Sequence, residues 1–112
     1  MEVTRFAPSP TGHLHLGGAR TALFSYLFAK ANKGKFLLRF EDTDQERSKD
    51  EYVESILNSL DWMKIKIDSD PVYQSKKVME HKELAIELYK KGFAYACDCS
   101  EEALAKMREE QI

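Results

Sequence analysis

Neither an excess of positive charge nor long hydrophobic runs occur in this sequence. Its 112 residues carry 17 Lys and Arg against 19 Asp and Glu, which gives a net charge of −2. The net charge of the whole chain therefore does not favour binding to nucleic acid, and any RNA contact must use a local patch of positive charge. No apolar run approaches the roughly 20 residues that span a bilayer, so no membrane contact is expected. The start, Met1–Val3, has no basic region of a signal peptide, which predicts a cytoplasmic protein.

Cysteine is also scarce, since Cys97 and Cys99 are the only two. They are too close together in sequence for a disulfide between them to stabilise a fold, which favours a reducing compartment. A structural zinc ion needs four ligands, and outside the first loop only His81 could join the pair. We therefore interpret Cys97 and Cys99 as at most half of a zinc site, and a complete site within this chain is not expected.

Proline and glycine are few, and most of them gather near the start. Pro8, Pro10 and Gly12 lie between a predicted strand, Val3–Phe6, and an apolar helical pattern that begins at Gly17 or Gly18. Proline fixes φ and glycine allows positive φ, so the chain must turn sharply here. A helix that starts directly after such a loop presents unpaired backbone N–H groups and the positive end of its dipole. This arrangement suits a phosphate.

The remaining pattern predicts an α/β protein with a Rossmann-like parallel sheet. The first helix should end near Asn32 with Gly34 at the C′ position, and Lys35–Glu41 should form the next strand. The carboxyl ends of parallel strands share one edge, so 7–15 and 41–44 should meet there. Further expectations are a helix capped by Ser48 with Glu51, an undecided segment Lys64–Asp68, a helix from Ser75 to Lys91, a strand Phe93–Asp98 and a helix capped by Ser100.

Two blocks of the sequence resemble one family. PSPTGHLHLGGARTALF is similar to the "HIGH" signature of class I aminoacyl-tRNA synthetases in its glutamyl-tRNA synthetase form, with 15–18 in the four signature places. Leu16 and Gly18 depart from the literal letters. A second block, 38–48, resembles the next segment of that family. The resemblance implies that 1–75 form the first half of the catalytic domain and that 76–112 begin the inserted α+β region for the tRNA acceptor end. It also implies that the chain is the amino-terminal piece of a longer protein.

The resemblance implies an ATP-dependent ligase, with Mg²⁺-bound ATP as a substrate. Glutamate would attack the α-phosphate of ATP, and the glutamyl group of the adenylate would pass to the 3′ end of tRNA(Glu). Such chemistry depends on positioning and charge stabilisation without a protein nucleophile. The isolated 112-residue chain is expected to be inactive or very weak.

The same resemblance assigns roles to residues. His15 is the expected catalytic residue, in contact with the ATP phosphates. Arg5 should bind the side-chain carboxylate of glutamate and Glu41 its α-ammonium group, while the roles of Asp42, Asp44 and Arg47 stay open. The ATP-binding set is Pro8, Ser9, Pro10, Thr11, Gly12, His13, Leu14, His15, Leu16, Gly17 and Gly18, and the glutamate-binding set is Arg5, Ala7, Ser9 and Glu41. Some family members complete a zinc site from a pair placed like Cys97 and Cys99.

Two alternative interpretations remain at this point. One is the related short enzyme that attaches glutamate to the queuosine base of tRNA(Asp), a glutamyl-Q tRNA(Asp) synthetase. The segments GGART and EDTD favour the glutamyl-tRNA synthetase over it. The other is a non-catalytic fragment that binds nucleotide weakly. Charging of tRNA(Gln) and the oligomeric state are not determined by this sequence.

Overall fold

The computed structural model describes residues 1–111, and the chain divides into two compact units, Met1–Val78 and the part from Met79 onward. Each unit is described separately. Ile112, the last residue of the expected acceptor-binding region, lies outside the described residues. None of the described helices is both long and apolar enough to cross a membrane.

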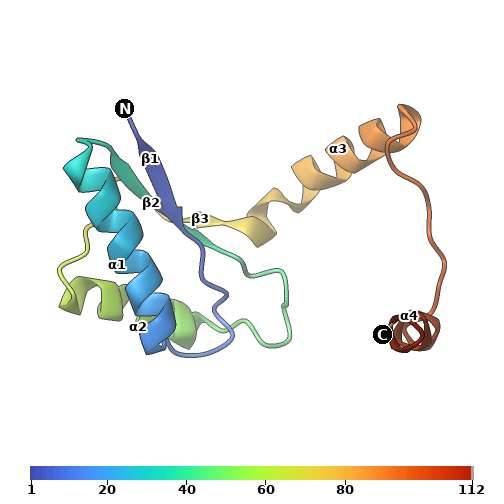
Figure 1. Ribbon diagram of the computed structural model, residues 1–112, viewed down its shortest axis with the longest axis horizontal. Coiled ribbons are helices and arrows are strands. Elements are labelled where there is room, and N and C mark those ends of the chain that lie inside the picture. Colours follow the sequence, from blue (N-terminus) through green and yellow to red (C-terminus); the bar gives the residue numbers. More distant parts are fainter. Residues whose placement is uncertain (112) are drawn as a thin grey trace. The chain divides into compact units, whose positions relative to one another are not determined.

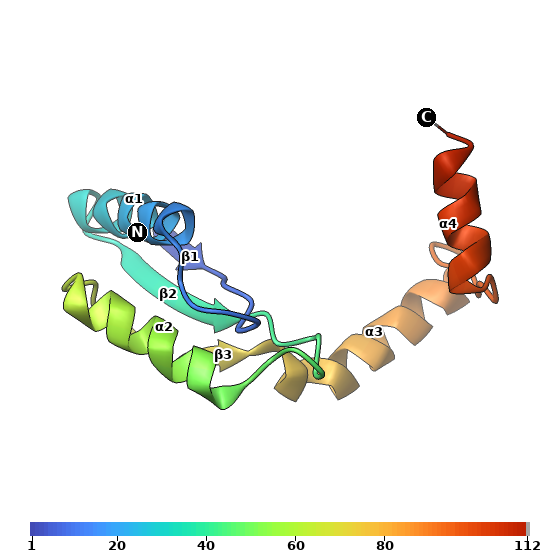
Figure 2. The same ribbon diagram turned by 90° about the horizontal axis from the view of Figure 1, so that it is seen from below.

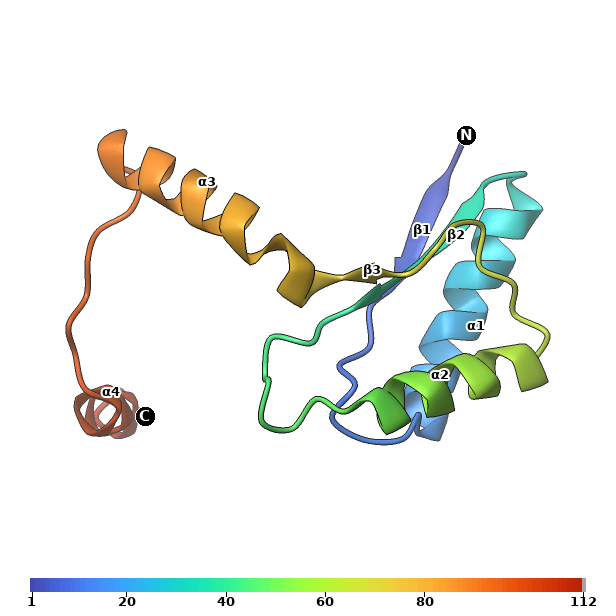
Figure 3. The ribbon, with the colours of Figure 1, turned by 180° about the vertical axis from the view of Figure 1, so that it is seen from behind.

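The first unit is built on a parallel three-stranded sheet in the order β1-β2-β3 (Figures 1 and 3). The strands are β1 (Val3–Phe6), β2 (Lys35–Phe40) and the short β3 (Val72–Tyr73). Both strand pairs are parallel, and Arg5 is the register partner of Leu37. This topology confirms the predicted α/β class with a Rossmann-like parallel sheet.

Two helices cover the same face of this sheet, α1 (Leu16–Ala31) and α2 (Asp50–Trp62). In Figure 2, α1 lies beside β1 and β2, whereas α2 lies toward β3. Side chains from both helices join the inward side chains of the strands in one core. Connections between parallel strands are right-handed as a rule. Because β1-α1-β2 and β2-α2-β3 step in the same direction across the sheet, both helices lie on one face. The core consists of Phe6, Ala22, Ala29, Phe36, Leu38, Phe40, Ile56, Leu60 and Ile65.

Strand β2 separates its side chains between the two faces. Phe36, Leu38 and Phe40 are buried against the helices, while Leu37 and Arg39 are only partly buried. Successive side chains of a strand point to opposite faces, so Leu37 and Arg39 lie on the face that α1 and α2 leave uncovered. Arg5 shares that face because it is the register partner of Leu37.

Helix α1 ends near Asn32 as predicted, but the residue at the C′ position differs from the prediction. Asn32 is the C-cap, and Lys33 rather than Gly34 takes the left-handed conformation, with φ of 52°. Gly34 donates its N–H to the carbonyl of Ala29 at 2.7 Å. A Cβ at Gly34 would lie 2.0 Å from the carbonyl oxygen of Glu2. Glycine is therefore required here for the close approach of two backbone segments.

Two predicted caps are wrong. Helix α2 begins at Asp50 with Lys49 as N-cap and no side-chain cap, so Ser48 and Glu51 form no capping box. The N–H of Ser48 donates to the carbonyl of Asp44 at 2.9 Å, which keeps Ser48 in the preceding loop. Ser75 lies inside a 3₁₀ turn, η1 (Gln74–Lys77), and the following helix α3 starts only at Val78 (Val78–Lys90). Lys64–Asp68 contains no strand.

The second unit contains the rest of α3 and the helix α4 (Glu101–Glu109). The Ser100 hydroxyl accepts the N–H of Ala103 at 3.2 Å, which confirms the predicted cap of α4. The predicted strand Phe93–Asp98 is wrong, because these residues form no strand. Phe93 and Tyr95 are 80% and 86% exposed. A strand requires a partner edge, and the described residues of this unit supply none.

Candidate active site at the carboxyl edge of the sheet

The loop between β1 and α1 is docked onto the segment that follows β2. The carbonyl of Pro8 accepts the N–H of Glu41 at 2.9 Å, and the carbonyl of Pro10 accepts the N–H of Lys49 at 3.1 Å. Pro10 is fully buried. The two segments predicted to meet at the carboxyl ends of the strands are therefore joined by main-chain hydrogen bonds.

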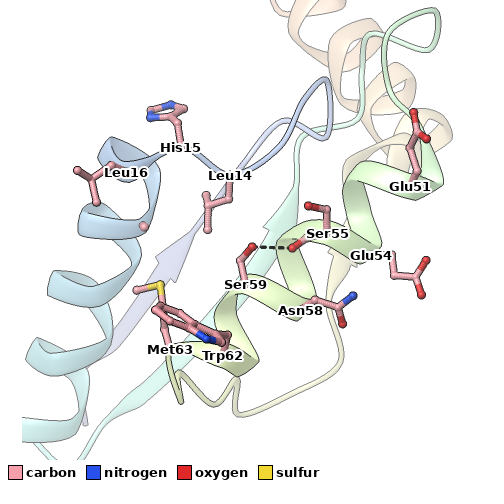
Figure 4. A pocket seen from close by; sticks show the side chains of 11 residues that line it. Leu14, His15, Leu16, Glu51, Glu54, Ser55, Asn58, Ser59, Trp62 and Met63 are labelled. Carbon is pink, nitrogen blue, oxygen red and sulfur yellow. Dashed lines mark hydrogen bonds between the residues drawn. The ribbon is translucent and has the colours of Figure 1, made fainter.

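His15 is the N-cap residue of α1. Its Nδ1 accepts the N–H groups of Gly17 at 3.1 Å and Gly18 at 3.4 Å. A neutral imidazole that accepts at Nδ1 carries its proton on Nε2, so Nε2 is the donor left to a ligand. The predicted set of unpaired N–H groups at this helix start is thus wrong for these two glycines, because the ring occupies them. An anion would meet the outward Nε2–H of the ring, which stands clear of α1 in Figure 4.

The two glycines provide room for side chains of the loop. A Cβ at Gly17 would lie 3.0 Å from Cε1 of His15, and a Cβ at Gly18 would lie 2.8 Å from Cδ1 of Leu14. Contacts this short would force the neighbouring side chains to move. The glycines therefore allow the His15 ring to close over the helix start.

His13 is tied to α2. Its Nδ1 shares a 2.9 Å hydrogen bond with Oγ of Ser55, and its ring meets Tyr52 edge-on at 5.2 Å between centroids. His13 and His15 line one cavity of about 430 Å³. The other lining residues are Phe6, Pro8, Ser9, Thr11, Gly12, Leu14, Gly18 and Ile56.

A second cavity, of about 670 Å³, lies between the start of α1 and α2 (Figure 4). Leu16, 86% exposed, and Trp62, 82% exposed, contribute apolar surface to it. The polar part comes from α2, where Oγ of Ser59 donates to the carbonyl of Ser55 at 2.7 Å. Sequence reasoning treated α2 only as a core helix. The polar residues Glu51, Ser55 and Ser59, spaced four apart, were the signal that one face of this helix lines a cavity.

Arg5 and Glu41, the two charged residues predicted to bind glutamate, lie close together. Nη1 of Arg5 is 3.8 Å from Oε1 of Glu41. A second cation, Arg39, donates from Nη2 to the same Oε1 at 2.5 Å. Sequence reasoning missed Arg39, although its spacing of two residues from Glu41 on an extended segment indicates one shared face. The cluster of Arg5, Arg39 and Glu41 thus has two positive charges and one negative charge.

The other predicted site residues are dispersed around this edge. Ser9 lines the cavity of about 430 Å³. Ala7, two residues earlier in the chain, is partly buried. Pro10 lines a separate small cavity with Asp42 and Tyr73.

Two aspartates of the second block are held by neighbours. Asp42 accepts the N–H of Ser75 at 2.8 Å and its hydroxyl at 2.6 Å. Burial raises the pKa of Asp42, but the hydrogen bonds from Ser75 outweigh this effect and hold the pKa below its usual range. Nε of Arg47 donates to Asp44 at 2.6 Å, and this bond lowers the pKa of Asp44. Asp44 and Arg47, whose roles the sequence left open, thus form an ion pair with each other.

Replacing Asp42 by asparagine is expected to destabilise the first unit by about 1 kcal/mol at neutral pH. The folded pKa of Asp42 is lowered, so its stabilisation is complete above the ordinary value of 3.8 and is lost as pH falls through the folded value. The difference between wild type and Asp42→Asn in urea unfolding should therefore shrink toward about pH 3. Asp70→Asn is the control, since Asp70 is exposed and its carboxylate makes no hydrogen bond or ion pair within residues 1–111. An equal difference at both pH values would contradict the proposed role of the charge.

The two cysteines lie in the second unit and are both exposed thiols. The backbone N–H of Cys99, and then its thiol, lower the pKa of Cys97. Residues 1–111 contain no group of three or more His, Cys, Asp or Glu side chains placed to hold a metal ion. The half zinc site stays a prediction.

Comparison with known proteins places the chain in a family. The family described as "tRNA synthetases class I (E and Q), catalytic domain" matches residues 2–112, and the chain belongs to this family. Glutamate–tRNA ligase 2 of Ehrlichia chaffeensis is 58% identical over 108 residues, which are 96% of this chain and 23% of that protein. Glutamate–tRNA ligase of Prochlorococcus marinus is 56% identical over 107 residues, 96% of this chain and 22% of that protein.

A solved structure agrees with these relatives. The crystal structure of the glutamate-tRNA synthetase from Elizabethkingia anophelis is similar with a TM-score of 0.85 and 40% sequence identity, over 96% of this chain and 23% of that one. The chain thus spans about a quarter of the length of the relatives that it matches.

Proposed function

We propose that this chain forms part of the catalytic domain of a glutamate–tRNA ligase, which activates L-glutamate with ATP and transfers it to the 3′ end of tRNA(Glu). The observation that carries the proposal is the charge pattern of Arg5, Arg39 and Glu41. Glutamate carries carboxylates and an ammonium group, and this cluster places a cation, Arg5, beside an anion, Glu41, at one edge of the sheet. Guanidinium groups match carboxylates in planar, two-bond geometry.

The nucleotide would bind along the loop between β1 and α1. His15 keeps Nε2–H available while Nδ1 caps α1, so the ring can donate to the charge that develops on the α-phosphate or on the leaving pyrophosphate. The cavity of about 430 Å³ beside His13 and His15 offers room for part of the nucleotide. Mg²⁺ would enter with ATP, and it would neutralise phosphate charge.

Transfer to tRNA would involve the part of the chain after Lys76. By its similarity to the ligases, this part would begin the region that contacts the acceptor end of tRNA(Glu). The same similarity supports a cytoplasmic location. The relatives named above are glutamate–tRNA ligases, and this favours the ligase over an enzyme that modifies the queuosine base.

ATP binding by the loop tests the nucleotide part of the proposal. Titration of the 112-residue chain with Mg²⁺-ATP up to about 5 mM, near the weak end of the usual affinity range, should shift the backbone NMR signals of residues 11–19. Signals of the α4 residues serve as an internal control and should not move. A loop whose signals do not respond to ATP, in a chain that retains its NMR fold pattern, would contradict the site.

The complete reaction needs a full-length ligase. A chimera in which this chain replaces the matching segment of the Ehrlichia chaffeensis ligase provides one, since the two sequences are 58% identical there. The chimera is expected to charge tRNA(Glu) with glutamate, while the 112-residue chain alone should show little or no glutamate- and ATP-dependent pyrophosphate exchange. A folded chimera without charging activity would contradict the proposed function.

A further inference from the structure

We propose that Arg39 is a positioning residue, which holds one carboxylate oxygen of Glu41 and leaves the other oxygen available to a substrate ammonium group. The inference rests on the proposed function, because it assigns a task to Glu41 in glutamate binding. Arg39 lies in the second sequence block, but the sequence assigned no role to it. In the proposed arrangement Arg39 touches no substrate.

The side-chain hydrogen bond of Glu41 and its shortest distances to the two arginines involve one carboxylate oxygen, Oε1. Nη2 of Arg39 donates to Oε1 at 2.5 Å, and Nη1 of Arg5 lies 3.8 Å from the same atom. Within residues 1–111, Oε2 of Glu41 accepts no hydrogen bond. A carboxylate can accept at both oxygens, so Oε2 keeps its full capacity for a ligand. The side chain of Glu41 is 37% exposed, and a small cation can therefore reach it.

The strand fixes the direction from which Arg39 acts. Arg39 belongs to β2, whose Phe36, Leu38 and Phe40 are buried in the core. Because neighbouring side chains on a strand point to opposite faces, burial of Phe40 keeps Arg39 and the following Glu41 on the uncovered face. The guanidinium thus approaches Oε1 from a rigid element rather than from a mobile loop.

Burial of part of the guanidinium sets Arg39 apart from a surface cation. Nε of Arg39 is buried and has no hydrogen-bond partner among the described residues. Surface ion pairs contribute little because both side chains move freely in water, whereas a partly buried, planar guanidinium has few alternative positions. The bond from Nη2 to Glu41 is the one side-chain hydrogen bond that Arg39 makes within residues 1–111.

Arg5 is the cation left for the substrate. Its contact with Glu41 is long, 3.8 Å, and its side chain is 47% exposed. Arg39 supplies the short contact to Glu41, so Arg5 can move its guanidinium toward a carboxylate without leaving Glu41 unpaired. Arg39 would thus hold the carboxylate of Glu41, and Arg5 would bind a carboxylate of the ligand.

The test uses the chimeric ligase and the variants Arg39→Gln and Arg39→Lys. Loss of a hydrogen bond to a charged group corresponds to about a tenfold change or more. We expect Arg39→Gln to raise the KM for glutamate about tenfold or more while the KM for ATP stays within about twofold. Arg39→Lys should recover part of the loss because it restores the charge without the planar fork. Lys35→Gln, which removes a cation from the other end of the same strand, is the control and should leave both constants unchanged.

A double-mutant cycle separates positioning from a role of Arg39 on its own. In the background Glu41→Gln, the further change Arg39→Gln should have little effect on the KM for glutamate, because the group that Arg39 orients is already lost. Additive effects, an unchanged KM for glutamate, or equal rises of both KM values with a lower melting temperature would each overturn the inference. If the unsubstituted chimera folds but does not charge tRNA(Glu), the proposed function fails instead.

Discussion

Replacing Gly34 by alanine is expected to destabilise the first unit by about 3 kcal/mol or more, at the upper end of the usual range for overpacking. The new Cβ would lie 2.0 Å from the carbonyl oxygen of Glu2 and 2.9 Å from its carbon. No side chain can rotate away to relieve these contacts, because both atoms belong to the backbone just before β1. Urea or thermal unfolding of the 112-residue chain measures the effect, with an expected fall in melting temperature of more than about 10 °C.

Gly12→Ala is the matched control for this substitution. A Cβ at Gly12 has no atom within 4 Å, and the residue does not have a positive φ. Alanine should therefore change the unfolding free energy by no more than about 1 kcal/mol, in the stabilising direction. If Gly34→Ala is as mild as Gly12→Ala, the tight junction between the end of α1 and the start of β1 is not as described.

Replacing His15 is expected to lower the charging rate of the chimeric ligase by about 100-fold or more, as for loss of one donor that stabilises developing charge. The proposed function adds a second task to the one that the structure shows, since Nδ1 caps α1 and Nε2 is the atom proposed to donate to the phosphates. Alanine removes both, and it should also cost about 1 kcal/mol of stability as an N-cap change.

Asparagine at position 15 separates the two tasks. Its side-chain oxygen is a good N-cap acceptor, so His15→Asn should keep the melting temperature of the chain. It has no group in the place of Nε2–H, so the charging rate should fall as far as in His15→Ala. Retained activity in His15→Asn would show that capping, rather than donation from Nε2, is what the reaction needs from this residue.

Local sequence signals predicted the parallel sheet and the first loop well. The short apolar run in Lys35–Glu41, the prolines after Phe6 and the helical pattern after Gly18 each had one dominant physical interpretation, and the structure agrees with them. The cap at Ser100 was also predicted correctly, because the serine and the helix that it caps are adjacent in sequence.

Two of the errors, at Ser75 and Gly34, concern residues whose partners are distant in sequence. Ser75 has the residue type of an N-cap, but its hydroxyl donates to Asp42, 33 positions away. Gly34 fits the usual place after a helix, but its real constraint is the backbone of Glu2. Phe93–Asp98 has the composition of a strand without a neighbouring strand in its unit. His15 is an unusual N-cap residue, and no residue pattern predicted that its Nδ1 would accept hydrogen bonds from the N–H groups of Gly17 and Gly18.

The loop before α1 is fastened by peptide groups, through the carbonyls of Pro8 and Pro10 and the N–H groups of Glu41 and Lys49. Such fastening does not depend on which side chains stand at 41 and 49, provided that neither is proline. The scaffold can therefore tolerate exchange of the acid at position 41 while the nucleotide loop stays in register. Under the proposed function, position 41 is a suitable starting point for redesigning amino-acid selectivity, since changes there alter the charge beside Arg5 and Arg39 without releasing the loop.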